Sequence, residues 1–85
     1  MLRLQCLKQK EVINVRDGFR FGCVSDLEIC VDGRINAIIV PGPISFLGFF
    51  GRDKEYYIKW CDIKCVGEDI ILVDVDVSCV LRVCV

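Results

Sequence analysis

The sequence predicts an all-β fold, a meander of antiparallel hairpins that curls into a small barrel. Two Asp-Gly dipeptides, Asp17-Gly18 and Asp32-Gly33, interrupt a stretch of alternating apolar and polar residues from Val12 to Val40. Glycine tolerates the positive φ of tight hairpin turns, and aspartate can bond its own backbone there. We predict five or six short strands with little helix, and a sheet of that size hides its edges best by closing.

Length and composition restrict the class of protein. The chain of 85 residues is long enough for one small domain and too short for two. Hydrophobic residues make up 54% and charged residues 27%, far from the composition of disordered proteins. Eleven basic and twelve acidic residues give a net charge of −1, whereas nucleic-acid binders usually carry a clustered basic face. We therefore expect no nucleic-acid ligand.

The first hairpin is expected to follow a short entry element that contains Leu4 and Leu7. Its first strand ends at the first Asp-Gly turn, and its second strand is long, from Phe19 to Val31. Gly22 interrupts that strand near its start, where a glycine often marks a bulge at which a small sheet bends.

The C-terminal half of this long strand alternates, so one face should be buried and the other solvated. The predicted core face holds Leu27, Ile29 and Val31. The third strand, Arg34 to Val40, carries apolar residues on both faces and is expected to be buried on both sides. A Pro-Gly-Pro break ends it.

The second half of the chain contains three further extended segments, with brief turns between them. They are Glu55 to Trp60, Lys64 to Val66 and Ile70 to Asp74. Alternation in the first of these directs Tyr57 outward and three residues into the core. The predicted inward residues are Tyr56, Ile58 and Trp60.

The last eleven residues, Val75 to Val85, form a strongly apolar C-terminal extension. Three arrangements are open: the segment extends the last strand, forms a new edge strand that pairs with another copy of the chain, or frays. A β-prone edge of this kind can pair with other chains.

A membrane-spanning segment and a secretory signal are both disfavoured. The longest uncharged stretch, Ile35 to Gly51, is shorter than the ~20 apolar residues that a spanning helix needs, and prolines break it. The N-terminus lacks the continuous apolar region and the small-residue cleavage site of a signal peptide. We expect a cytoplasmic protein with no membrane span.

Seven cysteines are present, at positions Cys6, Cys23, Cys30, Cys61, Cys65, Cys79 and Cys84. An odd number in a reducing compartment argues against a disulfide framework. The spacings of Cys61 with Cys65 and of Cys79 with Cys84 occur in structural zinc sites. However, residues five apart in a strand lie roughly 16 Å from each other, while sulfurs on one zinc ion are about 4 Å apart. We expect small buried hydrophobic side chains, and we predict no metal and no cofactor.

No set of residues points to catalysis. The chain has no histidine, and no nucleophile is accompanied by a base and an oxyanion donor. Asp26 and Glu28 share a strand face about 6.6 Å apart, but a carboxylate pair on such a face is usually solvated. We expect a protein that is not an enzyme, with no catalytic residue.

The segment FLGFFGR, from Phe46 to Arg52, is the strongest candidate for a binding site. Connections usually run over the surface, and an exposed apolar patch marks an interaction site. The alternative is that this loop plugs one mouth of the barrel. Tyr57 lies close by in sequence, and aromatic residues are enriched at interface hot spots. The predicted protein-binding residues are Phe46, Leu47, Phe49, Phe50, Arg52 and Tyr57.

Several motifs in register carry a resemblance to a known family. They are KEVINVRDGFRFGCVSDLEICVDGRINAIIVPG, FLGFFGR, Tyr-Ile-x-Trp and Ile-x-x-x-Gly-Glu-Asp-x-Ile-Leu-Val. In this order they resemble the PRC-barrel proteins and, more narrowly, the YlmC/YmxH sporulation proteins. The resemblance covers Leu4 to Asp74, and it implies a small, closed or partly open six-stranded antiparallel barrel over residues 1–74 with residues 75–85 as an extension. Lys59 departs from the pattern, which often has proline there.

The resemblance also implies a function. PRC-barrel domains form the cytoplasmic part of the photosynthetic reaction-centre H subunit and one half of the ribosome maturation factor RimM, where the barrel docks on other proteins. We therefore expect a non-enzymatic, sporulation-related adaptor whose partner is another protein, and a homodimer is a further option. The alternatives are a cysteine-based metal-binding or redox-sensing protein and a ribosome- or RNA-associated factor, although the acidic pI of about 5.3 argues against the last.

Overall fold

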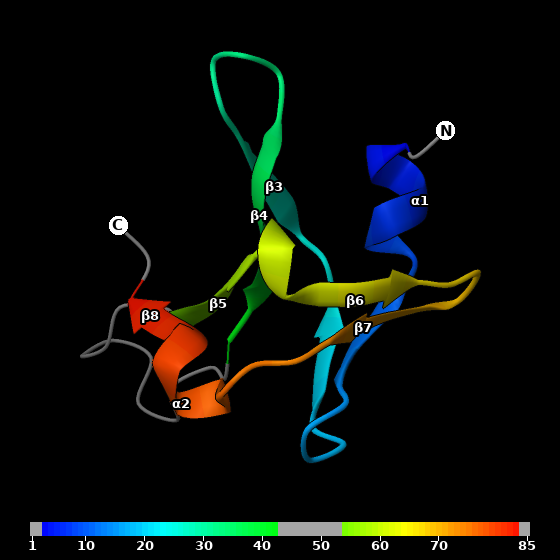
Figure 1. Cartoon of the computed structure of the whole chain (residues 1–85), viewed down its shortest axis with the longest axis vertical. Coiled ribbons are helices and arrows are strands. Elements are labelled where there is room, and N and C mark those ends of the chain that lie inside the picture. The colour runs from blue at the N-terminus through cyan, green and yellow to red at the C-terminus, as the bar shows by residue number, and fades with distance from the viewer. Residues whose placement is uncertain (1–2, 43–53, 84–85) are drawn as a thin grey trace.

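The computed structural model describes residues 3–42 and 54–83 (Figure 1). Within these ranges it has eight strands and three short helices. They are α1 (Leu4–Lys8), β1 (Glu11–Asn14), β2 (Arg20–Cys23), β3 (Asp26–Ile29), β4 (Ile35–Pro41), β5 (Lys54–Lys59), the 3₁₀-helix η1 (Trp60–Asp62), β6 (Ile63–Val66), β7 (Ile70–Val73), α2 (Val77–Val80) and β8 (Leu81–Val83). The strands form two four-stranded sheets, sheet A in the order β2-β1-β7-β6 and sheet B in the order β3-β4-β5-β8.

The all-β class is confirmed, but the predicted closed or partly open six-stranded barrel is not, because the described residues form two four-stranded sheets and no closed barrel. The expected long strand from Phe19 to Val31 is broken at Val24 and Ser25, so that it gives β2 to sheet A and β3 to sheet B. Val24 is buried, and the backbone N–H and the hydroxyl of Ser25 both donate to the carbonyl of Ile39, at 2.8 and 3.1 Å. These contacts fix the corner where the chain changes sheets.

Sheet A also contains a pairing that a meander lacks. β1 lies parallel to β7, with Glu11 opposite Ile70 and Asn14 opposite Val73. Two strands far apart in the sequence are thereby joined at the centre of one sheet, because 59 residues separate the paired positions (70 minus 11). Because sequence periodicity carries no information on strand partners, this pairing was not predicted.

Both Asp-Gly hairpin turns are confirmed. The side chain of Asp17 accepts from the N–H of Phe19 at 2.9 Å, and that of Asp32 accepts from the N–H of Arg34 at 3.1 Å. The glycine of each turn has a positive φ, of 75° and 90°, a conformation in which any other L-residue would be strained. Local chemistry therefore specifies β1–β2 and β3–β4 as hairpins.

The predicted bulge at Gly22 is also present. Gly22 has φ of 103°, and the register passes from Val12 opposite Gly22 to Ile13 opposite Arg20, which leaves Phe21 as the extra residue. Phe21 is buried, and its ring lies 4.9 Å from that of Tyr56 in an edge-to-face arrangement. The bulge thus aims one aromatic side chain of sheet A at an aromatic side chain of sheet B.

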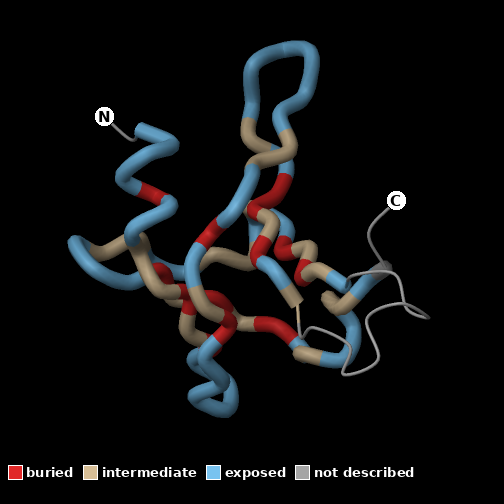
Figure 2. The backbone as a smooth tube through the Cα atoms, turned by 180° about the vertical axis from the view of Figure 1, so that it is seen from behind, coloured by how far each residue is buried: buried red, intermediate tan, exposed pale blue. Residues whose placement is uncertain are grey.

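The core gathers buried segments of both sheets near the middle of the molecule (Figure 2). Its members are Leu7, Val12, Phe21, Val24, Ile38, Val40, Tyr56, Ile58, Ile71, Val73 and Val75. The inward orientation predicted for Tyr56 and Ile58 is confirmed, and Trp60 packs against the core while remaining partly exposed. The prediction that β4 is buried on both faces holds for its central part, Ala37 to Val40, in which only Ile39 is partly exposed.

The prediction was wrong for the far end of β3. Leu27 is half-buried, but Ile29 is 59% exposed and Val31 is fully exposed. The reason is that the β3–β4 hairpin extends beyond the rest of the two sheets (Figures 1 and 2), so that no other described segment covers its tip.

The cysteines also depart from expectation. Six of the seven lie within the described ranges, at Cys6, Cys23, Cys30, Cys61, Cys65 and Cys79, and all six are exposed. Cys23 and Cys65 lie on β2 and β6, the two edges of sheet A, and Cys30 lies in the hairpin tip. Cys6, Cys61 and Cys79 lie in the short helices α1, η1 and α2. The prediction of buried thiols is therefore wrong for these six positions, because edge strands, a turn and short surface helices leave one side of the chain uncovered.

The C-terminal extension forms an edge strand of its own molecule. β8 pairs antiparallel with β5, with Lys54, Glu55 and Tyr56 opposite Val83, Arg82 and Leu81. This differs from the three arrangements left open, because the new edge strand pairs with its own chain and not with another copy. The division between residues 1–74 and 75–85 stays a prediction.

Candidate functional site

Of the predicted binding residues, Tyr57 is the one that the structure describes. Phe46, Leu47, Phe49, Phe50 and Arg52 lie outside the described residues. Tyr57 is half-buried on β5 and faces away from the core side chains Tyr56 and Ile58, as predicted. It lies on the outer face of sheet B, where Ile39 of β4 is its direct neighbour.

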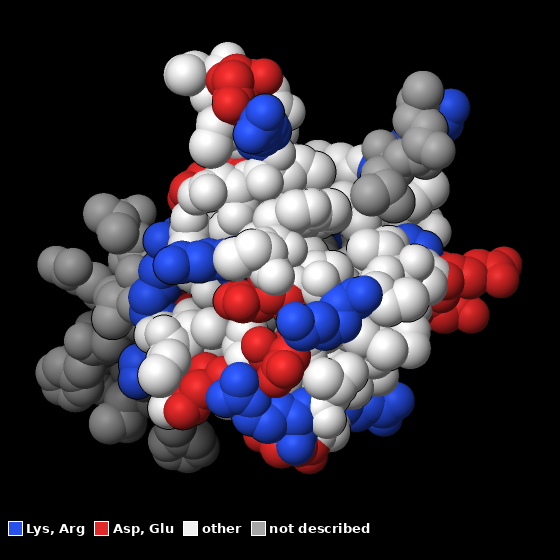
Figure 3. Space-filling model, in the orientation of Figure 1, with Lys and Arg blue, Asp and Glu red and all other residues white. Residues whose placement is uncertain are grey.

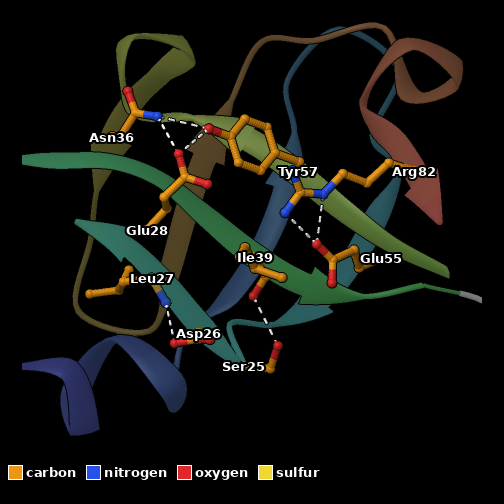
Figure 4. Close-up of polar contacts among 9 residues, drawn as sticks. All are labelled: Ser25, Asp26, Leu27, Glu28, Asn36, Ile39, Glu55, Tyr57 and Arg82. Carbon is orange, nitrogen blue, oxygen red and sulfur yellow. Dashed lines mark hydrogen bonds and ion pairs between the residues drawn. The ribbon is translucent and has the colours of Figure 1, made fainter. Parts of the chain in front are cut away.

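The phenol of Tyr57 is hydrogen-bonded to two other side chains, those of Glu28 and Asn36 (Figure 4). Its hydroxyl donates to Oε1 of Glu28 at 2.7 Å, and the amide of Asn36 donates to the same oxygen at 2.6 Å. The same amide is 2.8 Å from the Tyr57 hydroxyl. Glu28 faces Ala37 and Ile29 faces Ile35, so Asn36 is the extra residue of a β-bulge. The bulge provides the position from which Asn36 contacts both partners.

One face of the Tyr57 ring is covered by Arg82 of the C-terminal strand β8. The guanidinium carbon of Arg82 lies 4.1 Å from the ring centroid, a cation–π geometry. Nη2 and Nε of Arg82 also lie 2.6 and 2.7 Å from Oε2 of Glu55. We call the five residues Glu28, Asn36, Glu55, Tyr57 and Arg82 the Tyr57 cluster. It has a member on each of the four strands of sheet B, with Glu28 on β3, Asn36 on β4, Glu55 and Tyr57 on β5 and Arg82 on β8.

Hydrogen bonding sets the protonation states in the Tyr57 cluster. The bond from Tyr57, followed by the bond from Asn36, lowers the pKa of Glu28 below its ordinary value of 4.5, and the charge of Arg82 acts in the same direction. The same bond to Glu28 raises the pKa of Tyr57 above 10.0, and partial desolvation adds to this effect. Glu28 is therefore an anion that accepts, and Tyr57 a neutral donor, across the physiological range.

This arrangement suits recognition better than acid–base chemistry. A carboxylate whose pKa is lowered is a weak base, and a phenol whose pKa is raised releases its proton less readily. The Tyr57 hydroxyl and the Glu28 carboxylate are already hydrogen-bonded to each other. The chemical property that remains is a hydrogen-bonded face that carries an aromatic ring, an arginine and a carboxylate.

Substituting Tyr57 with phenylalanine is expected to flatten the pH dependence of stability at both ends. The lowered pKa of Glu28 stabilises the fold above pH 4.5, and this contribution is lost as the pH falls through the lowered value. The raised pKa of Tyr57 stabilises the fold below pH 10.0, and this contribution is lost as the pH rises above it. Urea unfolding from pH 3 to 11 measures both limbs. E28Q should reproduce the effect of Y57F, and an unchanged acid limb in Y57F would refute the coupling.

A second exposed feature, which sequence reasoning missed, is the tip of the β3–β4 hairpin. We define the hairpin tip as residues 29–34. Within it, Ile29 and Val31 expose apolar side chains, and Arg34 lies 3.7 Å from Asp32 in an ion pair. Alternation had assigned Ile29 and Val31 to the core. The length of the predicted hairpin was the available signal, because a hairpin longer than the sheet that covers it must expose its tip.

Charges are interspersed on the face that Figure 3 shows, where basic and acidic side chains alternate over short distances. Among the described residues, ion pairs link Arg16 with Asp74, Arg20 with Glu11, Arg34 with Asp32 and Arg82 with Glu55. Within residues 3–42 and 54–83, no group of three or more potential ligands could hold a metal ion. None of the helices within these ranges has the length and hydrophobicity of a membrane span.

Comparison with known proteins identifies relatives over most of the chain. No family model matches the sequence. The chain is 42% identical over 74 residues to the Bacillus subtilis protein named "Probable sporulation protein YlmC", which covers 86% of this chain and 91% of that protein. It is 34% identical over 74 residues to an uncharacterised protein of Clostridium acetobutylicum (86% and 84%) and 31% identical over 77 residues to the uncharacterised YmxH of Bacillus subtilis (87% and 89%). At this identity and coverage, the chain belongs to the YlmC/YmxH family.

Proposed function

We propose that the protein is a non-enzymatic adaptor of the sporulation programme that binds another protein through the hairpin tip. The observation that carries this proposal is the exposure of Ile29 and Val31 at the end of a projecting hairpin. The name of the relative YlmC supports the link to sporulation. A cytoplasmic location and a docking role like that of PRC-barrel domains are parts of the same proposal.

The hairpin tip is built as a rigid anchor. The N–H of Cys30 donates to the carbonyl of Arg34 at 2.8 Å, and the N–H of Gly33 donates to the carbonyl of Cys30 at 2.9 Å. Ile29 and Val31 are β-branched, so they have few rotamers to lose when a partner buries them. Two apolar side chains with charged neighbours match the pattern of an interface with an apolar centre and a polar rim.

The Tyr57 cluster holds the base of this hairpin. Glu28 is the residue before Ile29 on β3, and Asn36 follows Ile35 on β4, so both strands of the hairpin are tied to Tyr57 of β5. Fixing the tip before binding reduces the ordering cost of association. The loop from Phe46 to Arg52 stays a predicted second contact of the adaptor.

The double substitution I29S/V31S tests the role of the hairpin tip. The tagged chain is produced in sporulating Bacillus subtilis cells that lack YlmC. The cells are treated with a cross-linker, and the proteins that co-purify with the tag are quantified against those from an untagged strain. Loss of two anchor side chains at an interface centre is expected to reduce the recovery of a specific partner by about 30-fold, since a hot-spot truncation costs ~2 kcal/mol or more.

The control is V15S, because Val15 is similarly exposed, at 50%, but lies next to the β1–β2 turn of sheet A. This variant should retain the partner at the level of the unsubstituted chain. If I29S/V31S recovers the same proteins as V15S, in the same amounts, the hairpin tip is not the docking site.

A further inference from the structure

We propose that β5 and the Tyr57 cluster form an acceptor site for the C-terminal arm of a second copy of the chain, so that two copies exchange arms. The C-terminal arm is defined as residues 76–83, which contain α2 and β8. In the closed form of Figure 1 the arm occupies the acceptor site of its own molecule. In the exchanged form the Tyr57 cluster is incomplete without Arg82 of the other copy.

The acceptor site has both backbone and side-chain elements. β5 offers its edge to β8 over Lys54 to Tyr56. Glu55 and the Tyr57 ring then hold the guanidinium of Arg82 from two directions, at 2.6 Å and 4.1 Å. An added strand gains affinity from main-chain hydrogen bonds and specificity from alternate side chains. A second copy supplies the matching segment, because every chain carries the same arm.

The structure also defines where the arm can separate from the body. The buried side chain of Asn14 donates to the carbonyl of Val75 at 2.8 Å and accepts from its N–H at 3.1 Å. Val75 is itself buried. Asp76, the next residue, is exposed. The body therefore retains the chain through Val75, and the hinge falls at Asp76.

The sequence of α2 favours opening at this hinge. The helix has four residues, Val-Ser-Cys-Val, all of types with weak helix propensity, and its length is far below that at which isolated helices persist. Its described cap is Asp76, whose carboxylate accepts from the N–H and the hydroxyl of Ser78 at 3.0 and 2.7 Å. Valine prefers extended structure, so the closed form holds this segment against its local preference.

Conversion of α2 into extended backbone would also lengthen the arm enough to reach a second copy. Four residues span about 6 Å as an α-helix and about 13 Å as a strand. The exchanged contacts are the same as those of the closed form and repeat about a two-fold axis, which closes the assembly at two copies. Because a tethered arm has an effective concentration in the millimolar range, exchange in the wild type should become visible only as the protein is concentrated.

Complementary charge reversal tests the exchange in the full chain. E55R places two arginines at one site of the closed form, and R82E places two carboxylates there. When the two variants are mixed, an exchanged heterodimer has opposite charges at both sites. One variant is labelled with ¹⁵N, both are refolded together from denaturant under reducing conditions, and native mass spectrometry counts each species.

The heterodimer is expected to exceed each homodimer by about tenfold, because two like-charge pairs are replaced by two opposite-charge pairs. The matched control is the cis double variant E55R/R82E, whose closed form is already complementary and which should behave like the wild type. Refolding the variants together keeps the test valid even if neither folds alone.

Monomers alone, or dimers in statistical proportions, would overturn the proposal and would show that β8 is a fixed edge strand. Failure to recover any folded species from the mixture, while the cis double variant folds, would overturn it as well. The readout is independent of a heterologous partner, since I29S/V31S alters the hairpin tip and should exchange arms like the wild type.

Discussion

Replacing Asn14 with leucine is expected to lower the free energy of unfolding by about 3 to 5 kcal/mol. Asn14 is fully buried, and its amide pairs with both backbone groups of Val75. The substitution leaves a buried N–H and a buried C=O without partners, and each such group costs ~1–3 kcal/mol. The amide also extends the β1–β7 pairing beyond Val73, whose carbonyl accepts from the N–H of Val15 at 2.8 Å.

Urea unfolding followed by circular dichroism measures this loss. The matched control is N36A, which removes an exposed asparagine with two side-chain hydrogen bonds and is expected to cost less than about 1.5 kcal/mol. Equal losses in the two variants would mean that burial of the Asn14 amide contributes nothing. The comparison therefore separates the role of a buried polar bridge from that of a surface cluster.

Replacing Ile58 with alanine is expected to cost about 2 to 5 kcal/mol, the range for truncation of a fully buried large aliphatic residue. Ile58 has no exposed surface and lies opposite Ile38 at the centre of sheet B. Its side chain belongs to the core that packs the two sheets together. The cavity left behind removes contacts from both sheets, so the midpoint of a single cooperative transition should fall.

The control for this prediction is I29A, which makes the same chemical change at the exposed hairpin tip. It should alter stability by about 0.5 kcal/mol or less, as surface substitutions do. In both thermal and urea unfolding, I58A should lose more stability than I29A. A loss in I29A as large as that in I58A would mean that Ile29 is covered in solution.

Local chemistry in the sequence determined the elements that depend on near neighbours. The two Asp-Gly turns, the bulge at Gly22 and the opposite orientations of Tyr56 and Tyr57 follow from backbone sterics and the two-residue period of a strand. Each involves residues a few positions apart. They were therefore predictable from one sequence, and the motifs in the same segments were sufficient to indicate the family.

Partners distant in sequence determined what the sequence alone could not predict. β1 joins β7 at the centre of sheet A, and Val24 and Ser25 turn the chain from one sheet into the other. Periodicity states which face of a strand is apolar but not whether a second layer exists to cover it. For that reason Ile29 and Val31 were assigned to the core, although the projecting hairpin leaves them exposed.

The candidate site shows the same division. The sequence indicated that Tyr57 points outward, but the residues that surround it come from β3, β4 and β8, at separations of 21 to 29 positions for Asn36 and Glu28. Only strand pairing and a β-bulge bring these side chains within hydrogen-bond distance. The sequence by itself thus determined turns, strand faces and family, while the tertiary structure determined sheet partners, exposure and the Tyr57 cluster, because those depend on contacts between segments that no local pattern encodes.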